Sequence, residues 1–504
     1  MTALIAGAPS SYAQSWDHVN WPLVKAYVFR MQVRIAKAVR EERFGKAKAL
    51  QHLLSRSFYG KLWAVKRVTS NKGSRTPGID RKIWNTSRQR WQAALNLNVR
   101  GYKASPLRRI YIAKTNGKRR PLGIPTLHDR AMQELFALGL RPIAETTGDS
   151  HSYGFREKRS LHDATKMAFI SLSSQTSAKW VLEADIKACF DCISHEWLLN
   201  NIPLPKRILR QWLKCGYMES TALYPTDDGT PQGGIISPIL CNMTLDGLQD
   251  LVPKGRIKKR KKLNIIRYAD DFIITGASPE ILLNEIKPNL VSFLAERGLS
   301  LSEEKTKLSH IDNGFNFLGM NIRKYKGKLL IKPQDGKVQD LINKVKELLA
   351  SIRGVPFHVL LTKLNRIVRG WTYAYRCVVA KERMGFIDNR VYYLVRKWLL
   401  REHRSKTNAW ISKRYRRHDL GRWDFVASYT LASGVRRSIR LFRAADLPIR
   451  YHIKIRSEAN PYDPAFAEYF SERQLKRKLR AMSNRVQLNA DSYQKALRGG
   501  FSFV

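Results

Sequence analysis

A pair of adjacent carboxylates stands where the sequence predicts the tip of a β-hairpin. Strand-forming residues flank Asp270 and Asp271 on both sides in the segment IIRYADDFII (265–274). Two unpaired acids in an apolar setting repel each other, so a cation is expected to hold them. Mg²⁺ suits the pair because it takes a few carboxylates while keeping waters and substrate phosphates. A remote Lys or Arg, or a plain solvated turn, would also explain the two acids.

A further carboxylate is predicted on a separate strand. Asp185 follows strand-forming residues in the segment WVLEADI (180–186). Facing Asp270 on a neighbouring hairpin, it would complete a site for two metal ions roughly 4 Å apart. One ion would activate an attacking 3′-hydroxyl and the other would steady a leaving pyrophosphate. Asp191 is an alternative ligand, but its position after Phe190 favours a helix start, so we expect Asp185 to be the ligand.

A glycine-rich stretch, GTPQGGIISP (229–238), lies between these two segments. Gly233 and Gly234 permit close approach of the backbone to another molecule, and Gln232 offers an amide beside them. A tight turn would explain the glycines equally well. It would not explain why the turn lies between two acidic strands.

The elements expected to position these residues form an α+β fold. From about residue 180 to 322, short β-branched or apolar runs alternate with helical patterns. Before them, apolar residues recur at three- and four-residue steps in 17–63, and a loop rich in Gly, Ser, Thr and Pro follows at 69–80. After Pro333, two amphipathic patterns predict a helical bundle.

The charge of the chain indicates a polyanionic partner. Over 504 residues it carries 91 Lys and Arg against 41 Asp and Glu, a formal charge of +50. Nucleic acid fits because each phosphate contact releases counterions. A merely cationic protein of ribosomal type is the alternative on composition alone. Hydrophobic residues make up 43% of the chain, which argues against global disorder. Its length of 504 residues allows about three domains.

Two basic segments lie in the C-terminal part. The stretch 396–417 holds nine Lys or Arg against one acid, with Trp398, Trp410 and Tyr415 among them. A second basic cluster spans 473–480. A charge run is usually a solvated face, but interleaved aromatics in a chain of this sign favour nucleic-acid binding.

Membrane attachment and a disulfide framework are not expected. No run approaches the roughly 20 apolar residues of a membrane-spanning helix, and the first 16 residues do not resemble a secretion signal. The five cysteines are odd in number and thinly spread, which indicates a reducing cytoplasm. Cys189 and Cys192 have CxxC spacing, but no second Cys or His pair lies at zinc-like distance.

Six blocks, in order, resemble the reverse transcriptases encoded by group II introns, the intron-encoded maturases. They are RRIYIAKTNGKRRPLGIPTLHDRAMQ (108–133), SYGFREKRSLHDA (152–164), EADIKACFDCISHEWLL (183–199), GTPQGGIISPILCN (229–242), RYADDFII (267–274) and LSEEKTKLSHIDNGFNFLGMNI (301–322). The resemblance continues through KLNRIVRGWTYAYR (363–376) to IKIRSEANPYDP (453–464), which covers nearly the whole chain. The YADD box together with the PQGG box is a specific pairing.

The resemblance implies a right-hand polymerase. Its expected parts are an N-terminal helical extension with a template-gripping loop (1–80), fingers and palm with an antiparallel sheet (81–330), a helical thumb called domain X (331–440) and a basic DNA-binding region (441–504). The implied activity is RNA-directed DNA synthesis with Mg²⁺ and dNTPs. The implied partners are group II intron RNA, which the protein would help to splice, and target DNA, at which it would act in retrohoming by target-primed reverse transcription. The implied location is the bacterial cytoplasm, as a nucleoid-associated ribonucleoprotein.

Residue by residue, the resemblance assigns roles in the palm. Asp185, Asp270 and Asp271 match the catalytic metal ligands. Phe190 matches the aromatic gate that would clash with the 2′-hydroxyl of a ribonucleotide and so select dNTPs. The presence of all three carboxylates and of the gate argues against a decayed palm.

The resemblance also assigns contacts with nucleotides and nucleic acid. Lys114 and Arg120 match cations that clamp the incoming triphosphate, and Gln232 matches the residue beside the nucleotide pocket. The residues expected to contact nucleic acid are Lys72, Arg75, Arg369, Arg414, Arg416 and Arg417.

One feature departs from the family pattern. Many relatives end in an HNH endonuclease with Cys pairs and a His cluster, whereas here no cysteine follows Cys377. We therefore expect that this chain does not cut the second DNA strand. DNA synthesis could instead be primed by a nascent strand at a replication fork. Two other interpretations compete with an active polymerase-maturase. They are a splicing-only maturase with a relic palm, and a related reverse transcriptase recruited to phage defence.

Overall fold

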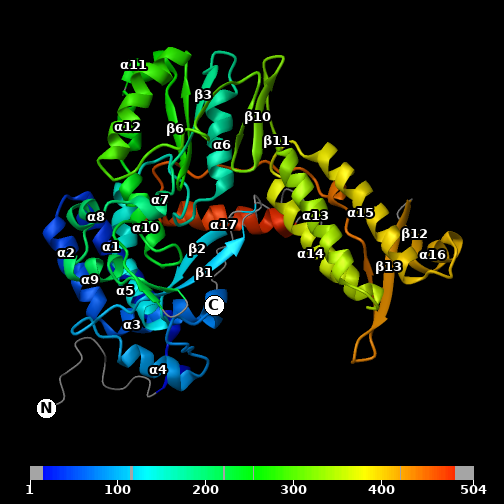
Figure 1. The fold of residues 1–504 in the computed structure, drawn as a ribbon, viewed down its shortest axis with the longest axis horizontal. Coiled ribbons are helices and arrows are strands. Elements are labelled where there is room, and N and C mark those ends of the chain that lie inside the picture. The colour runs from blue at the N-terminus through cyan, green and yellow to red at the C-terminus, as the bar shows by residue number, and fades with distance from the viewer. Residues whose placement is uncertain are drawn as a thin grey trace.

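The computed structural model describes residues 15–113, 117, 119–219, 222–253, 255–419 and 422–482. Three groups of elements, taken in the order in which each begins along the chain, make up the structure (Figure 1). The first is a set of N-terminal helices beside a small sheet, the second a central sheet covered by helices, and the third a helical bundle. Their order confirms the predicted α+β fold.

The N-terminal helices enclose one long helix. They are α1 (Trp21–Arg40), α2 (Phe44–Arg56), α3 (Phe58–Thr69) and α4 (Ser87–Leu95), around α5 (Leu127–Thr147). Because α1, α2 and α3 cover different sides of α5, that helix buries most of its residues. The small sheet beside them has the order β2-β1-β4-β5. Its strands are β1 (Leu107–Ala113), β2 (Arg119–Ile124), β4 (Tyr217–Glu219) and β5 (Ala222–Tyr224).

The central sheet has the order β6-β7-β3-β8, and every neighbouring pair is antiparallel. Its strands are β3 (Trp180–Asp185), β6 (Asn264–Tyr268), β7 (Asp271–Gly276) and β8 (Lys307–His310). Alternate residues of a strand point to opposite faces, so Leu182 and Ile274 enter one core while Val181 and Ile273 enter another. The sheet therefore lies between two packed hydrophobic cores.

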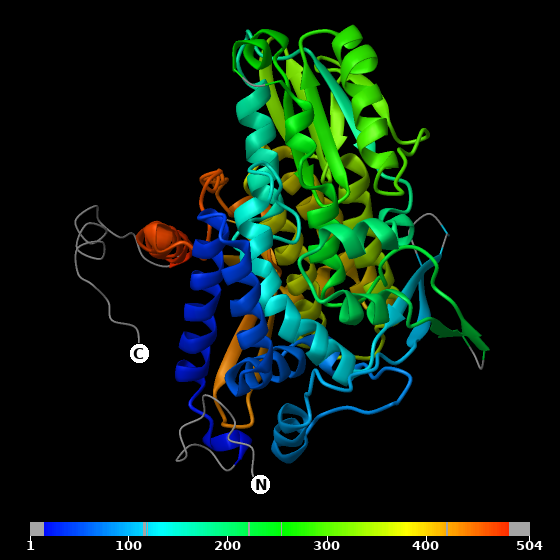
Figure 2. The ribbon, with the colours of Figure 1, turned by 90° about the vertical axis from the view of Figure 1, so that its left-hand side faces the viewer.

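Helices cover both faces of this sheet (Figure 2). One core includes residues of α8 (His195–Asn201), α9 (Lys206–Leu213), α10 (Ser237–Leu245) and α12 (Lys287–Ala295). The other includes residues of α6 (Leu161–Leu172). Two further helices complete this part, α7 (Cys189–Cys192) and α11 (Gly255–Lys261).

The bundle predicted after Pro333 is confirmed. It consists of α13 (Asp335–Ser351), α14 (Phe357–Tyr375), α15 (Lys381–Glu402) and α16 (Asn408–Tyr415). A sheet of β9 (Phe315–Phe317), β10 (Met320–Tyr325) and β11 (Lys328–Pro333) leads into it. A second three-stranded sheet follows it, formed by β12 (Arg416–Asp419), β13 (Arg422–Thr430) and β14 (Arg436–Arg440).

Two aromatic residues expected among nucleic-acid contacts belong to the bundle core instead. Trp398 is 4% exposed, and its indole N–H donates to the carbonyl of Ile352 at 2.9 Å. Tyr415 packs edge-on against Phe357. Both rings lie on the apolar faces of their helices, α15 and α16, which point toward the core. Of the three aromatics in this basic stretch, only Trp410 is exposed.

A segment that lacks helix and strand ties the bundle to the N-terminal helices. We call residues 449–463 the strap. The amide of Arg450 donates to Arg376 at the end of α14, and the amide of Ile455 donates to the Asp163 carboxylate in α6. At its far end Asp463 forms an ion pair with Arg40 of α1. The strap then continues into the basic helix α17 (Ala467–Met482).

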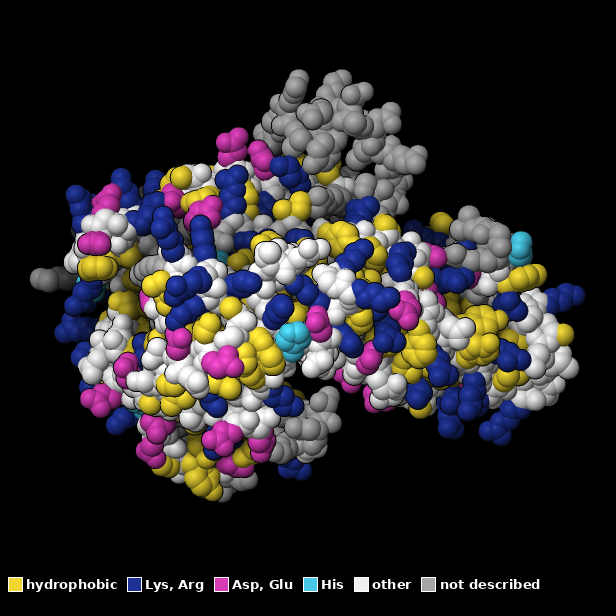
Figure 3. Space-filling model, turned by 90° about the horizontal axis from the view of Figure 1, so that it is seen from above, with side chains coloured by type: hydrophobic (Ala, Val, Ile, Leu, Met, Phe, Trp, Pro, Cys, Tyr) yellow, Lys and Arg dark blue, Asp and Glu magenta, His cyan; other side chains and the backbone are white. Residues whose placement is uncertain are grey.

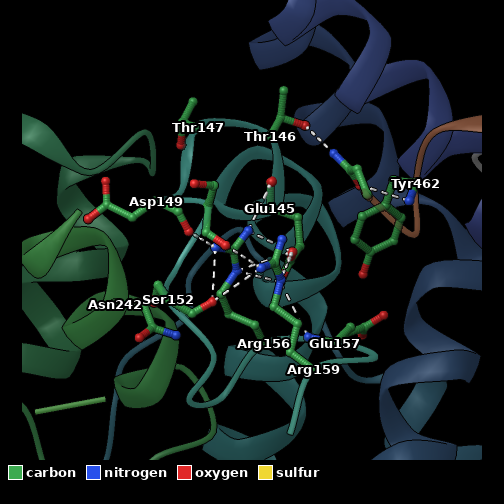
Figure 4. Close-up of polar contacts among 12 residues, drawn as sticks. Glu145, Thr146, Thr147, Asp149, Ser152, Arg156, Glu157, Arg159, Asn242 and Tyr462 are labelled. Atoms are coloured by element: carbon green, nitrogen blue, oxygen red, sulfur yellow. Dashed lines mark hydrogen bonds and ion pairs between the residues drawn. The ribbon is translucent and has the colours of Figure 1, made fainter. Parts of the chain in front are cut away.

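The strap crosses a buried polar cluster beside the end of α5 (Figure 4). Arg156 and Glu145 form an ion pair of 2.9 Å whose side chains are almost fully buried. Arg159 donates to the carbonyl of Ser457 in the strap at 2.9 Å, and Asn460 donates to the hydroxyl of Thr146 at 3.0 Å. The strap is therefore fixed to the folded core by specific contacts, with Ile455, Ala459 and Tyr462 buried.

In the described part of the chain, no helix is both long and apolar enough to cross a membrane. Lys and Arg side chains are spread over the face seen in Figure 3, with fewer acidic ones among them. The predicted positive character of the surface is thus visible across the central and C-terminal parts.

Candidate active site

The three candidate metal ligands come together at one end of the central sheet. Strand β3 pairs with β7 so that Asp185 lies opposite Asp271. Asp270 precedes Asp271 in the turn that joins β6 to β7. The turn is tight because Ala269 adopts a left-handed backbone with a φ of 59°. The fold therefore brings Asp185 to the hairpin tip, as the sequence interpretation required.

The three carboxylates repel one another in a partly buried site. Burial, followed by the charges of Asp185 and Asp270, raises the pKa of Asp271 to about 7. Burial and Asp185 also raise the pKa of Asp270, while Arg120 and Lys305 act in the opposite direction. A divalent cation would relieve this repulsion, because it favours the ionised form of each carboxyl group.

The sequence interpretation did not single out Lys305. Its Nζ lies 2.7 Å from Oδ2 of Asp185, and this contact raises the pKa of the lysine. The two residues are 120 positions apart, so only the fold reveals the pair. The one available signal was the block LSEEKTKL, which belongs to the family resemblance.

The carboxylates at the hairpin tip could supply part of the ligand set of Mg²⁺, but not all of it. Within the ranges that the structure describes, no three His, Cys, Asp or Glu side chains are gathered so as to hold a metal ion by themselves. Magnesium is commonly bound by one or two carboxylates, with waters and substrate phosphates as the remaining ligands. Asp185, Asp270 and Asp271 offer such carboxylates, and a cation among them would relieve their mutual repulsion.

The glycine-rich turn packs directly against the segment that follows β3. A Cβ on Gly229 would lie 2.6 Å from the backbone of Asp191, and one on Gly233 would lie 2.7 Å from the carbonyl of Gly123 in β2. The side-chain amide of Gln232 donates to both oxygens of Asp191, at 3.1 and 2.9 Å. Asp191 is thus bound to Gln232, whereas Asp185 is the acid that lies opposite Asp271 in the sheet.

Phe190, the expected gate, lies in α7, and Arg120, an expected triphosphate cation, lies in β2. Phe190 is half-buried and lies edge-on to Phe155, with ring centroids 6.3 Å apart. Arg120 in β2 is exposed, and its charge lowers the pKa of Asp270. Lys114 lies outside the described residues. Of the four predicted nucleotide-binding residues, Arg120 thus acts on Asp270, whereas Phe190 precedes Asp191, to which Gln232 is hydrogen-bonded.

A loop that precedes α6 holds the hairpin in place. Asn242 donates to the carbonyl of Gly154 at 2.8 Å, and the buried Arg267 of β6 donates to Asn242 at 3.2 Å. Arg267 also forms an ion pair with Asp246. A Cβ on Gly154 would lie 2.3 Å from the backbone nitrogen of Ala269 in the turn, so only glycine fits there.

We expect Gly154→Ala to lower DNA synthesis by roughly a hundredfold, because an ångström-scale shift of a catalytic hairpin has that effect. The measurement is steady-state primer extension, with the far-ultraviolet circular dichroism spectrum as a check on folding. Gly336→Ala is the matched control, because a Cβ there meets nothing within 4 Å. Equal extension by both variants would contradict the role assigned to Gly154.

The residues expected to contact nucleic acid lie apart from the carboxylates. Lys72 and Arg75 are exposed in a short 3-10 turn, and the buried Arg130 holds this turn through the carbonyls of Gly73 and Thr76. The sequence interpretation missed that anchor, because Arg130 lies in α5, more than 50 positions away.

The other predicted contacts lie in the bundle and its sheet. Arg369 is exposed in α14, and Arg414 in α16. Arg417 is also exposed, whereas Arg416 is half-buried and its guanidinium lies over the ring of Trp423 at 5.4 Å. Three of the four are therefore accessible to a partner.

The comparisons with known proteins concern most of the described chain. Residues 112–322 match the family described as reverse transcriptase (RNA-dependent DNA polymerase). Residues 16–97 match the N-terminal domain of reverse transcriptase, and residues 338–416 match the group II intron, maturase-specific domain. The three candidate carboxylates lie inside the first of these matches.

Two relatives illustrate the similarity. The chain is 31% identical to protein YkfC of Escherichia coli (strain K12) over 306 residues, 51% of this chain and 78% of YkfC. It is 32% identical to the group II intron-encoded protein LtrA of Lactococcus lactis subsp. cremoris over 353 residues, 55% of this chain and 58% of LtrA. The match thus spans little more than half the length of LtrA. Among solved structures, the chain is similar to telomerase from Candida albicans, with a TM-score of 0.36, 14% identity, and 61% and 65% of the two chains covered.

Proposed function

Because this chain belongs to the reverse transcriptases encoded by group II introns, we propose that it copies RNA into DNA and binds its intron RNA. The observation that carries the proposal is the meeting of Asp185, Asp270 and Asp271 at one end of an antiparallel sheet, ahead of a maturase-specific domain. Binding of intron RNA would assist splicing, and retrohoming would follow by target-primed reverse transcription at a DNA target.

The carboxylates would hold Mg²⁺ during DNA synthesis. When bound, Mg²⁺ would promote ionisation of the primer 3′-hydroxyl and neutralise charge on the leaving pyrophosphate. Asp185, Asp270 and Asp271 would be its ligands. In the free protein the ammonium of Lys305 forms an ion pair with Asp185 at 2.7 Å, in the place where a metal cation would lie during synthesis.

Other residues would position the nucleotide. Arg120 and Lys114 would carry the negative charge of the triphosphate. Phe190 would occupy the space that a ribose 2′-hydroxyl needs, and so favour dNTPs. Gln232, fixed by Asp191, would form one wall of the pocket.

The raised pKa of Asp271 predicts a link between pH and Mg²⁺ requirement. Below its pKa of about 7 the carboxyl group is mostly protonated, and a protonated carboxyl is a poor metal ligand. The Mg²⁺ concentration for half-maximal extension should therefore rise about tenfold for each pH unit below 7. Titrations of Mg²⁺ at pH 8, 7 and 6 measure this, and a constant half-maximal concentration would contradict it.

Specific observations weigh against the two alternatives. A splicing-only maturase would not need all three carboxylates, the gate and the interlocked glycine turn around them. A reverse transcriptase of phage defence would not need the maturase-specific domain that matches residues 338–416. The division into an extension (1–80), fingers and palm (81–330), thumb (331–440) and C-terminal region (441–504) belongs to the same proposal, as does a bacterial ribonucleoprotein near the nucleoid.

The RNA-binding half of the proposal is tested with a group II intron that carries the gene. Its precursor RNA is incubated at a low Mg²⁺ concentration with and without the protein. Splicing that depends on the protein, and that Asp270→Ala leaves unchanged, supports the maturase role. Equal splicing with and without the protein would contradict the maturase role.

A further inference from the structure

A basic hollow lies between the thumb helix α14, the strap and α17. Its volume is about 420 Å³. Six of the cations that line it are Arg376, Arg450, Lys454, Arg456, Arg473 and Arg477. The one acid in the lining, Glu472, already accepts a hydrogen bond from Lys476 at 2.8 Å. The described lining therefore has a strong excess of positive charge, as an anion site requires.

Crowding of like charges in this hollow points to the same kind of ligand. Burial, and then the neighbouring Arg450, lowers the pKa of Arg376. The amide of Arg450 is hydrogen-bonded to the carbonyl of Arg376 at 2.8 Å, so the backbone holds the two residues together. An anion between such side chains would relieve their repulsion, and phosphate suits guanidinium groups because it accepts paired hydrogen bonds.

An apolar hollow of about 210 Å³ adjoins the basic one. The two share His162, Cys377, Tyr451 and His452 in their linings. The second hollow continues over Phe169, Leu329 and Val379, from α6, β11 and the loop after α14. Side by side, the two hollows offer an apolar compartment next to a cationic one.

The floor shared by the two hollows is rigid. The buried carboxylate of Asp163 accepts hydrogen bonds from His452 at 2.8 Å and from Arg473 at 2.9 Å. Burial alone would raise the pKa of Asp163, but the hydrogen bonds from His452 and Ser160 outweigh it and lower the pKa to about 2. The site is therefore built before a ligand arrives.

We propose that the two hollows together take one unpaired nucleotide of a structured RNA. The phosphate would lie among Arg376, Arg456 and Arg477, and the base would enter the apolar compartment beside Phe169 and Val379. This inference rests on the proposed RNA-binding function, because it names where that RNA places an unpaired nucleotide. The chemistry is that of RNA loops and bulges, whose unstacked bases insert into pockets beside aromatic and basic side chains.

The location favours a bound RNA over the copied template or a DNA duplex. None of Asp185, Asp270 and Asp271 lines either hollow. In Figure 2, α17 lies at the edge of the molecule opposite to the β1–β2 hairpin, which belongs to the candidate active site. A DNA duplex keeps its bases stacked and would have to extrude one to fill the apolar compartment.

The test uses three labelled hairpins and the full chain. They are an RNA hairpin with one unpaired 4-thiouridine in its stem, the fully paired RNA hairpin, and a DNA hairpin with one unpaired thymidine. Val379→Trp fills the apolar compartment, and the double variant Arg456→Glu with Arg477→Glu strongly lowers the positive charge of the basic one. Lys287→Glu with Lys346→Glu, at exposed positions elsewhere, changes the net charge by the same amount.

We expect the wild type to bind the RNA with the unpaired nucleotide about tenfold more tightly than the paired RNA, as stacking of one base allows. Val379→Trp should remove this preference and leave the affinity for paired RNA unchanged. The Arg456/Arg477 variant should weaken binding and lower the slope of log affinity against log salt by about two, whereas the control variant should keep the preference. The 4-thiouridine should cross-link to residues that line the hollows.

Two results would overturn the inference. One is a wild-type protein without preference, or a preference that Val379→Trp leaves intact. The other is an equal preference for the DNA hairpin that the same variants remove, which would assign the site to DNA. Primer extension on an RNA template is measured on every variant. Its persistence would show that the polymerase proposal stands even where the nucleotide site fails.

Discussion

Asp185→Asn should reduce RNA-templated DNA synthesis at least about a thousandfold, because it removes one charge from the site proposed to bind a divalent cation and the reacting phosphates. The substitution keeps the shape of the side chain, and an amide can still accept a hydrogen bond from Lys305. Steady-state primer extension over a range of Mg²⁺ concentrations is the measurement. Binding of intron RNA should be unchanged, since the affected carboxylate faces no predicted RNA contact.

Asp191→Asn is the matched control for that variant. Asp191 is only six positions further along the chain, but its oxygens accept hydrogen bonds from Gln232. We expect this variant to keep most of its extension activity, with a change in the Michaelis constant for dNTPs through Gln232. If Asp191→Asn abolished synthesis and Asp185→Asn did not, the assignment of the metal ligand would be wrong.

Asp163→Ala should release the strap from α6. Removal of one partner from a buried ion pair costs about 3–5 kcal/mol, because the remaining charge is left without compensation. Here the carboxylate holds Arg473, His452 and the amide of Ile455. Native-state hydrogen exchange measures the effect. The amide of Ile455 should exchange at least a hundredfold faster, whereas amides in β3 and β7 should change little.

Two variants delimit this second prediction. Asp335→Ala breaks an exposed ion pair with Arg383, at 2.6 Å, and should change stability by less than about 1 kcal/mol. Asp163→Asn keeps an oxygen that can accept a hydrogen bond and should have an intermediate effect. Unchanged protection of Ile455 in Asp163→Ala would show that the strap is held by its apolar contacts alone.

The local parts of the candidate site could be predicted from the sequence. Asp270 and Asp271 lie between two strand-forming runs, and a hairpin with a carboxylate tip follows from spacing alone. The bundle after Pro333 likewise follows from helical periodicity. Both patterns act over a few residues, and the physical rules that produce them are local.

The contacts that complete the site could not be predicted in this way. Lys305 reaches Asp185 across 120 positions, and Gln232 reaches Asp191 across 41. The strap shows no hydrophobic periodicity, and single polar contacts hold it to four different helices, α1, α5, α6 and α14. Trp398 was misinterpreted for a related reason: a ring in a basic stretch can face the core while the cations beside it face the solvent.

Extension of a DNA primer on an RNA template, with dNTPs and Mg²⁺, tests the central claim most directly. The intact chain is compared with Asp270→Ala, and binding of the intron RNA is measured on both proteins. The account predicts DNA synthesis by the intact chain, none by the variant, and equal RNA binding. Absence of synthesis by both proteins while both still bind the RNA would contradict it and leave a splicing-only maturase.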